Sequence, residues 1–254
     1  MPSLPPEWED RFHGRRKGKP LRAARQVLFD QLLPQIQVQL PDDPHALIDP
    51  KDLFATPVRE TWMEIGFGGG EHLAAQWKAN PEIGFLGSEV FEYGIGKMLS
   101  ALVPDGWGGP GQPVPEHAPE PPGTLLLYPD DVRPLLTRLT ARCLTRLFLL
   151  FPDPWPKTRH AKRRMMSQVF LDQAARLLVD GGELRVATDD PGYALWSMQH
   201  LQAHPAFAWT ARQPRDWRDR PADWVETRYE AKAIQAGRAP CYLIWQRRAR
   251  GSEN

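Results

Sequence analysis

The sequence has little cysteine, no long apolar run and almost no net charge. Its 254 residues include two cysteines, Cys143 and Cys241, which stand far apart and outside any C-x-x-C spacing. This excludes a disulfide framework and a four-thiolate zinc site. No window supplies the roughly 18 apolar residues of a membrane span, and the first residues contain no apolar signal core. We therefore expect a soluble, cytoplasmic protein with no membrane partner.

Charge is balanced overall but clustered locally. The chain has 32 Lys and Arg against 31 Asp and Glu, so its net charge neither demands nor excludes a nucleic-acid partner. From Arg11 to Arg25, however, there are seven basic residues and no acid. We expect residues 1–26 to form a flexible basic arm, which is either a solvated tail or a phosphate-binding arm that orders on its partner. A helix starting near Val27, interrupted at Pro34, should lead into a single domain over 27–250.

Past residue 60, short apolar runs alternate with amphipathic stretches. The runs predict strands at 61–65, 83–88, 124–128, 144–151, 183–188, 206–210 and 241–246. The amphipathic stretches predict helices up to Asn80 and near 92–102, 164–178, 193–203 and 228–236, with a turn at 180–182. Residues 104–123 contain seven Pro and five Gly, which predicts a surface loop. Regular alternation with near-continuous apolar strands predicts an α/β fold around a doubly wound, mostly parallel sheet.

A glycine-rich turn follows the first strand, with the sequence EIGFGGGE from Glu64 to Glu71. Such a turn lets a ligand lie against the backbone at the carboxyl edge of a sheet. Glu89 ends the second strand, 21 positions after Gly68, where it can accept bonds from both hydroxyls of a ribose. Glu71 stands where a dinucleotide fingerprint has glycine. The two carboxylates of Glu64 and Glu71 suit a cationic ligand better than a pyrophosphate. The alternative is a tight turn with an incidental acid, but the pattern resembles that of S-adenosylmethionine-dependent methyltransferases.

Two aspartates, Asp130 and Asp131, follow the third strand. In methyltransferases of this fold, that strand end lies beside the adenine pocket, where a carboxylate can accept a hydrogen bond from the adenine amino group. An aspartate here can equally cap the helix that follows. Asp130 is the candidate because it lies nearer the strand end.

The most apolar strand is followed by the string FPDPWPKTRHAKRR, residues 151–164. Its prolines make the loop rigid, with Asp153 held between two of them and Trp155 offering a stacking face. Residues 157–164 include five Lys or Arg and no acid. Cations at a helix N-terminus oppose the helix dipole, so a polyanionic partner explains them better than a solvated helix start. No second ligand stands at metal-binding spacing from His160, and we expect no metal site.

This string resembles the signature of the bacterial tRNA (guanine-N7-)-methyltransferase family. The resemblance extends over most of the chain from about residue 60, including residues 64–70, 87–90, 181–184, 187–189 and 227–230, and the basic arm is similar to the family's N-terminus. It implies a Rossmann-like class I methyltransferase fold, with a seven-stranded sheet whose last strand is antiparallel. It also implies the cofactor S-adenosylmethionine, methylation of guanine N7 in the variable loop of tRNA, and a monomer or weak homodimer.

The resemblance also assigns roles to individual positions. The implied cofactor contacts are Glu64, Gly66, Gly68, Glu89, Asp130 and Asp153, the last being the active-site carboxylate as well. The implied contacts to the tRNA substrate are Lys157, Asp189, Thr227, Arg228, Tyr229 and Glu230. Candidate contacts to tRNA phosphates are Arg15, Arg16, Lys17, Arg159, Lys162, Arg163 and Arg164.

The sequence departs from the family pattern at two places. Asp190 stands where family members often have Trp, and the Pro/Gly-rich insertion at 104–123 is unusual. In addition, Thr227 and Glu230 have the spacing of a capping box at a helix start, a structural role that does not exclude contact with a nucleotide.

Three other functions compete with guanine N7 methylation. A methyltransferase acting on an exocyclic amine often has an N/D-P-P-Y/F motif, which the order Pro-Asp-Pro-Trp breaks. A non-catalytic RNA-binding protein has no need of the acids Glu64, Glu89 and Asp153. A nicotinamide dehydrogenase is disfavoured by Glu71.

Overall fold

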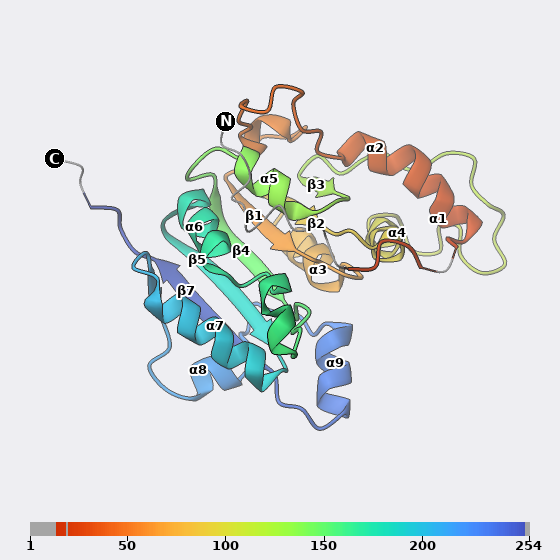
Figure 1. Ribbon diagram of the computed structural model, residues 1–254. Coiled ribbons are helices and arrows are strands. Elements are labelled where there is room, and N and C mark those ends of the chain that lie inside the picture. The colour runs from red at the N-terminus through yellow and green to blue at the C-terminus, as the bar shows by residue number, and fades with distance from the viewer. Residues whose placement is uncertain (1–13, 19, 252–254) are drawn as a thin grey trace.

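The computed structural model describes residues 14–18 and 20–251, so most of the predicted arm lies outside the described residues. The chain forms a seven-stranded sheet in the order β3-β2-β1-β4-β5-β7-β6 (Figure 1). The strands β1 to β5 are parallel, and β7 runs antiparallel to β5 and β6. The predicted doubly wound sheet with an antiparallel last strand is confirmed. The strands are Glu60–Ile65 (β1), Ile83–Ser88 (β2), Leu125–Tyr128 (β3), Leu144–Leu150 (β4), Leu178–Thr188 (β5), Phe207–Trp209 (β6) and Cys241–Arg247 (β7).

Helices cover both faces of the sheet because the central strands are apolar on both. Along β4, Leu147 and Leu149 pack in the core under α5, α6 and α7, whereas Phe148 and Leu150 pack in the core under α3 and α4. Side chains of a strand alternate between the faces, so one apolar run supplies both cores. The helices are Glu71–Ala79 (α3), Glu92–Ala101 (α4), Val132–Arg138 (α5), Gln168–Leu177 (α6), Pro191–Ala203 (α7), Arg215–Arg218 (α8) and Arg228–Gln235 (α9).

The N-terminal helix begins at Ala23 and continues through Pro34 instead of breaking there. It runs as α1 (Ala23–Val27), a π-helical turn (Leu28–Leu32) and α2 (Leu33–Ile36). The N–H of Leu33 bonds the carbonyl of Leu28, five residues back, which is the wider π spacing. A wider turn directly before a proline accommodates a residue that has no N–H to donate. The helix therefore includes residues 23–26 of the expected arm.

The predicted loop at 104–123 contains no helix or strand and packs on this N-terminal helix. The side-chain amide of Gln31 donates to the carbonyl of Glu116 and accepts from the N–H of Ala118, both at 2.9 Å. The loop and the helix lie side by side at one end of the molecule (Figure 1).

Two element boundaries differ from expectation. Ser167 caps α6, its hydroxyl accepting from the N–H of Phe170 at 3.3 Å, so the helix does not begin at Arg164. Three of the five basic residues, Arg159, Lys162 and Arg163, lie instead on a separate 3₁₀ helix, Thr158–Arg163. Lys157 and Arg164 flank that helix, so none of the five lies in the first turn of α6. In addition, β5 begins at Leu178 and includes the predicted turn at 180–182, where the pairing with β4 shifts register.

Asp190 caps helix α7. Its carboxylate accepts from the N–H of Tyr193 at 2.7 Å, and Pro191 occupies the first helical position.

Among the residues that the structure describes, no helix combines the length and apolar character that crossing a membrane requires.

Candidate active site

A cavity of about 620 Å³ opens at the carboxyl edge of the sheet. The ends of β1, β2, β3 and β4 each contribute to its wall, and Gly14, Arg15 and Tyr229 complete it. Ligands of open α/β sheets bind at this edge. The structure therefore brings together five of the predicted cofactor residues, which are Gly66, Gly68, Glu89, Asp130 and Asp153.

The floor of the cavity is the glycine turn, whose backbone only glycine adopts without strain. Gly66 and Gly68 have φ of +69° and +58°, in the left-handed region. A side chain on Gly94 of α4 would overlap the carbonyl oxygen of Gly68, so helix and turn are in backbone contact. On the other side, the ring of Tyr229 lies against Gly68.

Glu89 is fixed in the cavity by three backbone N–H groups. Its Oε2 accepts from Gly68 at 2.7 Å, and its Oε1 accepts from Val90 at 2.8 Å and Phe91 at 2.9 Å. Burial raises the pKa of Glu89, the three N–H groups lower it, and the nearby Asp153 carboxylate raises it. Glu89 and Asp153 thus lie close together in one cavity, and a cation between their carboxylates would relieve their repulsion.

The structure separates the roles of the paired aspartates. Asp131 is the helix cap, accepting from the N–H of Arg133 at 3.1 Å and forming an ion pair with its guanidinium. Asp130 lines the cavity without capping α5. Its carboxylate instead pairs at 2.7 Å with Arg16 of the basic arm, whose carbonyl accepts from the N–H of Glu92.

Glu64 does not lie among the described residues that line the cavity. It is 3% exposed, and its carboxylate accepts from Nδ1 of His72 in the first turn of α3, at 2.7 Å. The His72 ring packs between Phe148 and Trp224. Glu64 therefore joins β1 to α3 beside the glycine turn, and its contact with the cofactor stays a prediction.

Asp153 lies on the cavity wall in a loop with two strained positions. Phe151 and Trp155 have φ of +49° and +42°, which is costly for residues with a side chain. Arg164 stabilises this loop by donating to the carbonyls of Pro154 at 2.9 Å and Trp155 at 3.1 Å. Its guanidinium also stacks on Trp196, 4.5 Å from the ring centroid.

The other predicted basic residues surround the cavity mouth to different degrees. Lys162 and Arg163 line it, and Arg163 stacks over Trp155 at 4.9 Å. Lys157 and Arg159 are exposed on the adjoining surface and do not line the cavity. Lys17 lies 4.0 Å from Glu92.

In the predicted substrate segment at 227–230, Thr227 and Glu230 are buried. Arg228 is partly exposed and Tyr229 is exposed. Thr227 accepts from the N–H of Glu230 at 3.2 Å, which is one half of the capping box. The Glu230 carboxylate is buried and accepts instead from the hydroxyl of Tyr242, so the other half is not formed. Arg228 donates to the Tyr229 hydroxyl at 3.0 Å, while Asp189 pairs with Arg238.

Comparison with known proteins shows which family this chain belongs to. A family model described as a putative methyltransferase matches residues 59–243. A tRNA (guanine-N(7)-)-methyltransferase of Rhodospirillum rubrum is 56% identical, over 100% of this chain and 93% of the relative. The chain belongs to the tRNA (guanine-N7-)-methyltransferase family. A second relative with the same description, from Paramagnetospirillum magneticum, is 47% identical over 94% of both chains. A solved rRNA methylase of Streptococcus thermophilus aligns with a TM-score of 0.46 at 12% identity, over 81% of this chain and 92% of that one.

Sequence reasoning did not predict the ion pairs of Arg185. Arg185, 5% exposed in the middle of β5, bonds Glu183 and Asp223, the latter at 2.7 Å. Asp223 belongs to the segment that leads into α9, so this pair fixes on the sheet the segment that precedes Tyr229. A charged residue inside an apolar strand was the available signal.

The contact between Gly94 and Gly68 predicts a difference between two glycines of α4. Gly94→Ala should lower the free energy of unfolding by about 1–3 kcal/mol, because its side chain overlaps backbone. Gly96→Ala is the matched control. Its new methyl group would lie 3.0 Å from the movable tip of the Leu21 side chain, and alanine favours the helix over glycine by about 1 kcal/mol. Urea unfolding measures both, and equal effects would contradict the close approach.

Proposed function

We propose that this chain transfers a methyl group from S-adenosylmethionine to N7 of a guanine in the variable loop of tRNA. The main support is that Glu89 and Asp153 both line one cavity at the carboxyl edge of the sheet. The chain also belongs to the tRNA (guanine-N7-)-methyltransferase family. The two carboxylates support a cationic cofactor over a dinucleotide, whose pyrophosphate they would repel. We expect the protein to work in the cytoplasm, where this substrate occurs.

The cavity residues suit the parts of this cofactor. Glu89 keeps lone pairs free beside its three N–H bonds and would accept from the ribose hydroxyls. Asp130 would accept from the adenine amino group, in competition with Arg16. Gly66 and Gly68 leave room for the methionine portion. Glu64 would act from behind, by holding the turn through His72.

Asp153 is the proposed active-site carboxylate. When bound, S-adenosylmethionine supplies an electrophilic methyl group on a sulfonium. Guanine N7 carries an in-plane lone pair and no proton, so its attack needs no general base. Asp153 would hold the guanine by accepting from its N1–H or amino group, and its fixed negative charge would stabilise the positive charge that develops on the purine. The braced loop supports this role because it holds the carboxylate in place.

The role of Asp153 is tested by removing its charge at constant shape. Asp153→Asn should lower kcat by about 100-fold or more, the usual cost of losing one electrostatic contact in a transition state. Cofactor affinity, measured by isothermal titration, should fall far less than kcat, because Glu89 and the glycine turn still hold the cofactor. Near-normal turnover in single-turnover assays would refute the assignment.

The raised pKa of Glu89 predicts a pH dependence of cofactor binding. The ionised form accepts the hydroxyls and favours the cation, so affinity should fall as pH falls through the raised pKa, above the ordinary 4.5. Glu89→Gln should bind at least about 10-fold more weakly and lose this pH dependence. Titrations from neutral pH down to about pH 5 measure both. An identical pH profile in the variant would show that another group is responsible.

The substrate grip is proposed to involve the basic residues at the cavity mouth. Residues 14–17 reach the cavity from one side and the 3₁₀ helix from another, which supports contact with tRNA phosphates on both. A guanine stacked in folded tRNA would have to leave its stack to reach Asp153. Arg228 and Tyr229 would contact that base, a role that the position of Tyr229 on the cavity wall supports. Lys157 and Asp189 would contact the tRNA farther out, and buried Thr227 and Glu230 would act by holding α9.

Two arginines that the sequence could not distinguish should behave differently. Arg159→Ala should reduce the slope of log affinity for tRNA against log salt by about 1, with kcat at saturating tRNA retained. Arg164→Ala should leave that slope unchanged and lower kcat, because two carbonyls of the Asp153 loop lose their donor. Filter binding and steady-state kinetics measure the pair. A flattened slope for Arg164→Ala would show that it contacts phosphate after all.

A further inference from the structure

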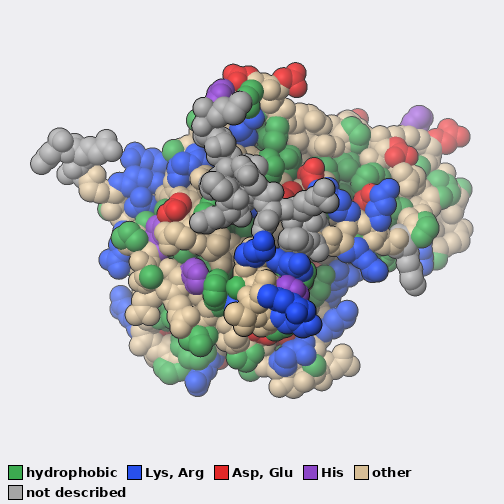
Figure 2. Space-filling view, viewed as in Figure 1, with side chains coloured by type: hydrophobic (Ala, Val, Ile, Leu, Met, Phe, Trp, Pro, Cys, Tyr) green, Lys and Arg blue, Asp and Glu red, His purple; other side chains and the backbone are tan. Residues whose placement is uncertain are grey.

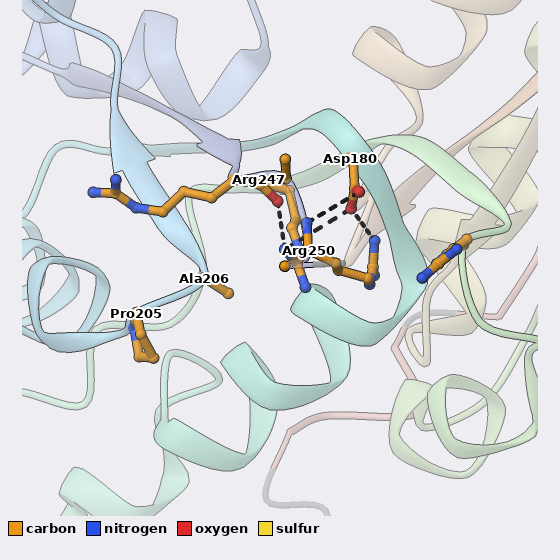
Figure 3. Close-up of a pocket in the computed structure, with 9 residues that line it drawn as sticks. Asp180, Pro205, Ala206, Arg247 and Arg250 are labelled. Carbon is orange, nitrogen blue, oxygen red and sulfur yellow. Dashed lines mark hydrogen bonds and ion pairs between the residues drawn. The ribbon is translucent and has the colours of Figure 1, made fainter. Parts of the chain in front are cut away.

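A second hollow, of about 690 Å³, lies at the opposite edge of the sheet from the cofactor cavity (Figure 3). It forms where β5 begins and β7 ends, beside the turn that precedes β6. Four arginines line it, and we call this group the arginine hollow: Arg142, Arg247, Arg248 and Arg250. Asp180 is the one carboxylate among the described lining residues.

Two of these arginines have structural duties at the end of α6. Arg250 pairs with Asp180 and donates to the carbonyl of Leu178 at 2.9 Å and to that of Ala175 at 2.7 Å. Arg247 donates to the same carbonyl of Ala175 at 3.2 Å. Carbonyls at a helix C-terminus need such donors, so these contacts account for the positions of both side chains.

Arg142 has no comparable duty. Its guanidinium forms no hydrogen bond or ion pair with any residue in the described part of the chain, although its backbone has φ of +58° in the left-handed region. The backbone N–H is held by the carbonyl of Arg176 at 3.0 Å. A strained position that directs an unpaired charge toward like charges calls for an explanation outside the fold.

The charges of the hollow are poorly balanced. Four arginines and one carboxylate line it, an excess of three positive charges in a chain whose total is +1. Arg247 and Arg250 pair with Asp180, and Arg248 donates to the carbonyl of Phe207 at 3.0 Å. Burial lowers the pKa of Arg247, and the guanidiniums of Arg250 and Arg142 lower it further against the opposing effect of Asp180. A second group of basic side chains thus gathers beside the C-terminal end of the chain, apart from the group at the cofactor side (Figure 2).

We propose that the arginine hollow is a phosphate-binding site, with Arg142 as its free ligand. The planar guanidinium matches a phosphate in fork geometry, and bound phosphate would neutralise the excess charge. The phosphate belongs either to an RNA backbone or to a free anion such as pyrophosphate. An RNA engaged at both edges must extend along β5, which at 11 residues spans about 35 Å.

The first experiment titrates the full chain with pyrophosphate in a phosphate-free buffer. Wild type should bind, and Arg142→Asn should bind at least about 5-fold more weakly, as expected for losing one charge-assisted contact. Asparagine tolerates positive φ, so the unfolding temperature without ligand should not fall. Arg59→Asn is the matched control, an exposed arginine before β1 that pairs with Glu60 and Glu82.

The second experiment distinguishes the sources by the salt dependence of tRNA binding. If the hollow holds an RNA phosphate, Arg142→Asn lowers the slope of log affinity against log salt by about 1 and the control does not. If it serves free phosphate, only the pyrophosphate affinity falls. Unchanged affinity for both ligands, or an equal loss in the Arg59→Asn control, overturns the proposal. Methyl transfer from labelled cofactor at saturating tRNA is measured in parallel, so failure of the proposed function is detected separately.

Discussion

The site depends on the clamp between Glu89 and the backbone N–H groups of Gly68, Val90 and Phe91. This clamp ties the end of β2 to the turn after β1, so these two neighbouring strands present one shared surface. It requires left-handed glycines in the turn and a glycine on α4 that permits backbone contact. It also fixes a negative charge in a partly buried cavity, where electrostatic interactions are stronger than in water.

The second requirement is a rigid loop opposite that clamp. Asp153 projects from a segment with two residues at positive φ, a conformation that persists only when its surroundings hold it. Arg164 supplies much of that support, by bonding two loop carbonyls and stacking on α7. The bond from buried Arg185 to Asp223 does the same for the segment before α9. Preorganisation here rests on charged groups that bond other parts of the chain.

Sequence patterns were sufficient for the sheet but less so for the contacts within it. Continuous apolar runs and glycine turns identified all seven strands, because a buried parallel strand requires them. The N-terminal helix was predicted to be interrupted at Pro34, but it continues through this residue. The π turn that accommodates the proline has no sequence signature, so it could not be predicted. The bond between Glu64 and His72 was not predicted, because nothing in the sequence shows that the two side chains meet. Arg164 looked like its basic neighbours, since its partner Trp196 lies 32 positions away.

The central claim is that the cavity directs a methyl group to guanine N7 in tRNA. Its most direct test is incubation of the purified chain with unmodified tRNA and labelled S-adenosylmethionine, followed by nucleoside mass spectrometry of the product. The account predicts 7-methylguanosine in the variable loop as the labelled nucleoside. Label on an exocyclic amine or a ribose, or a failure to label tRNA at all, would contradict it.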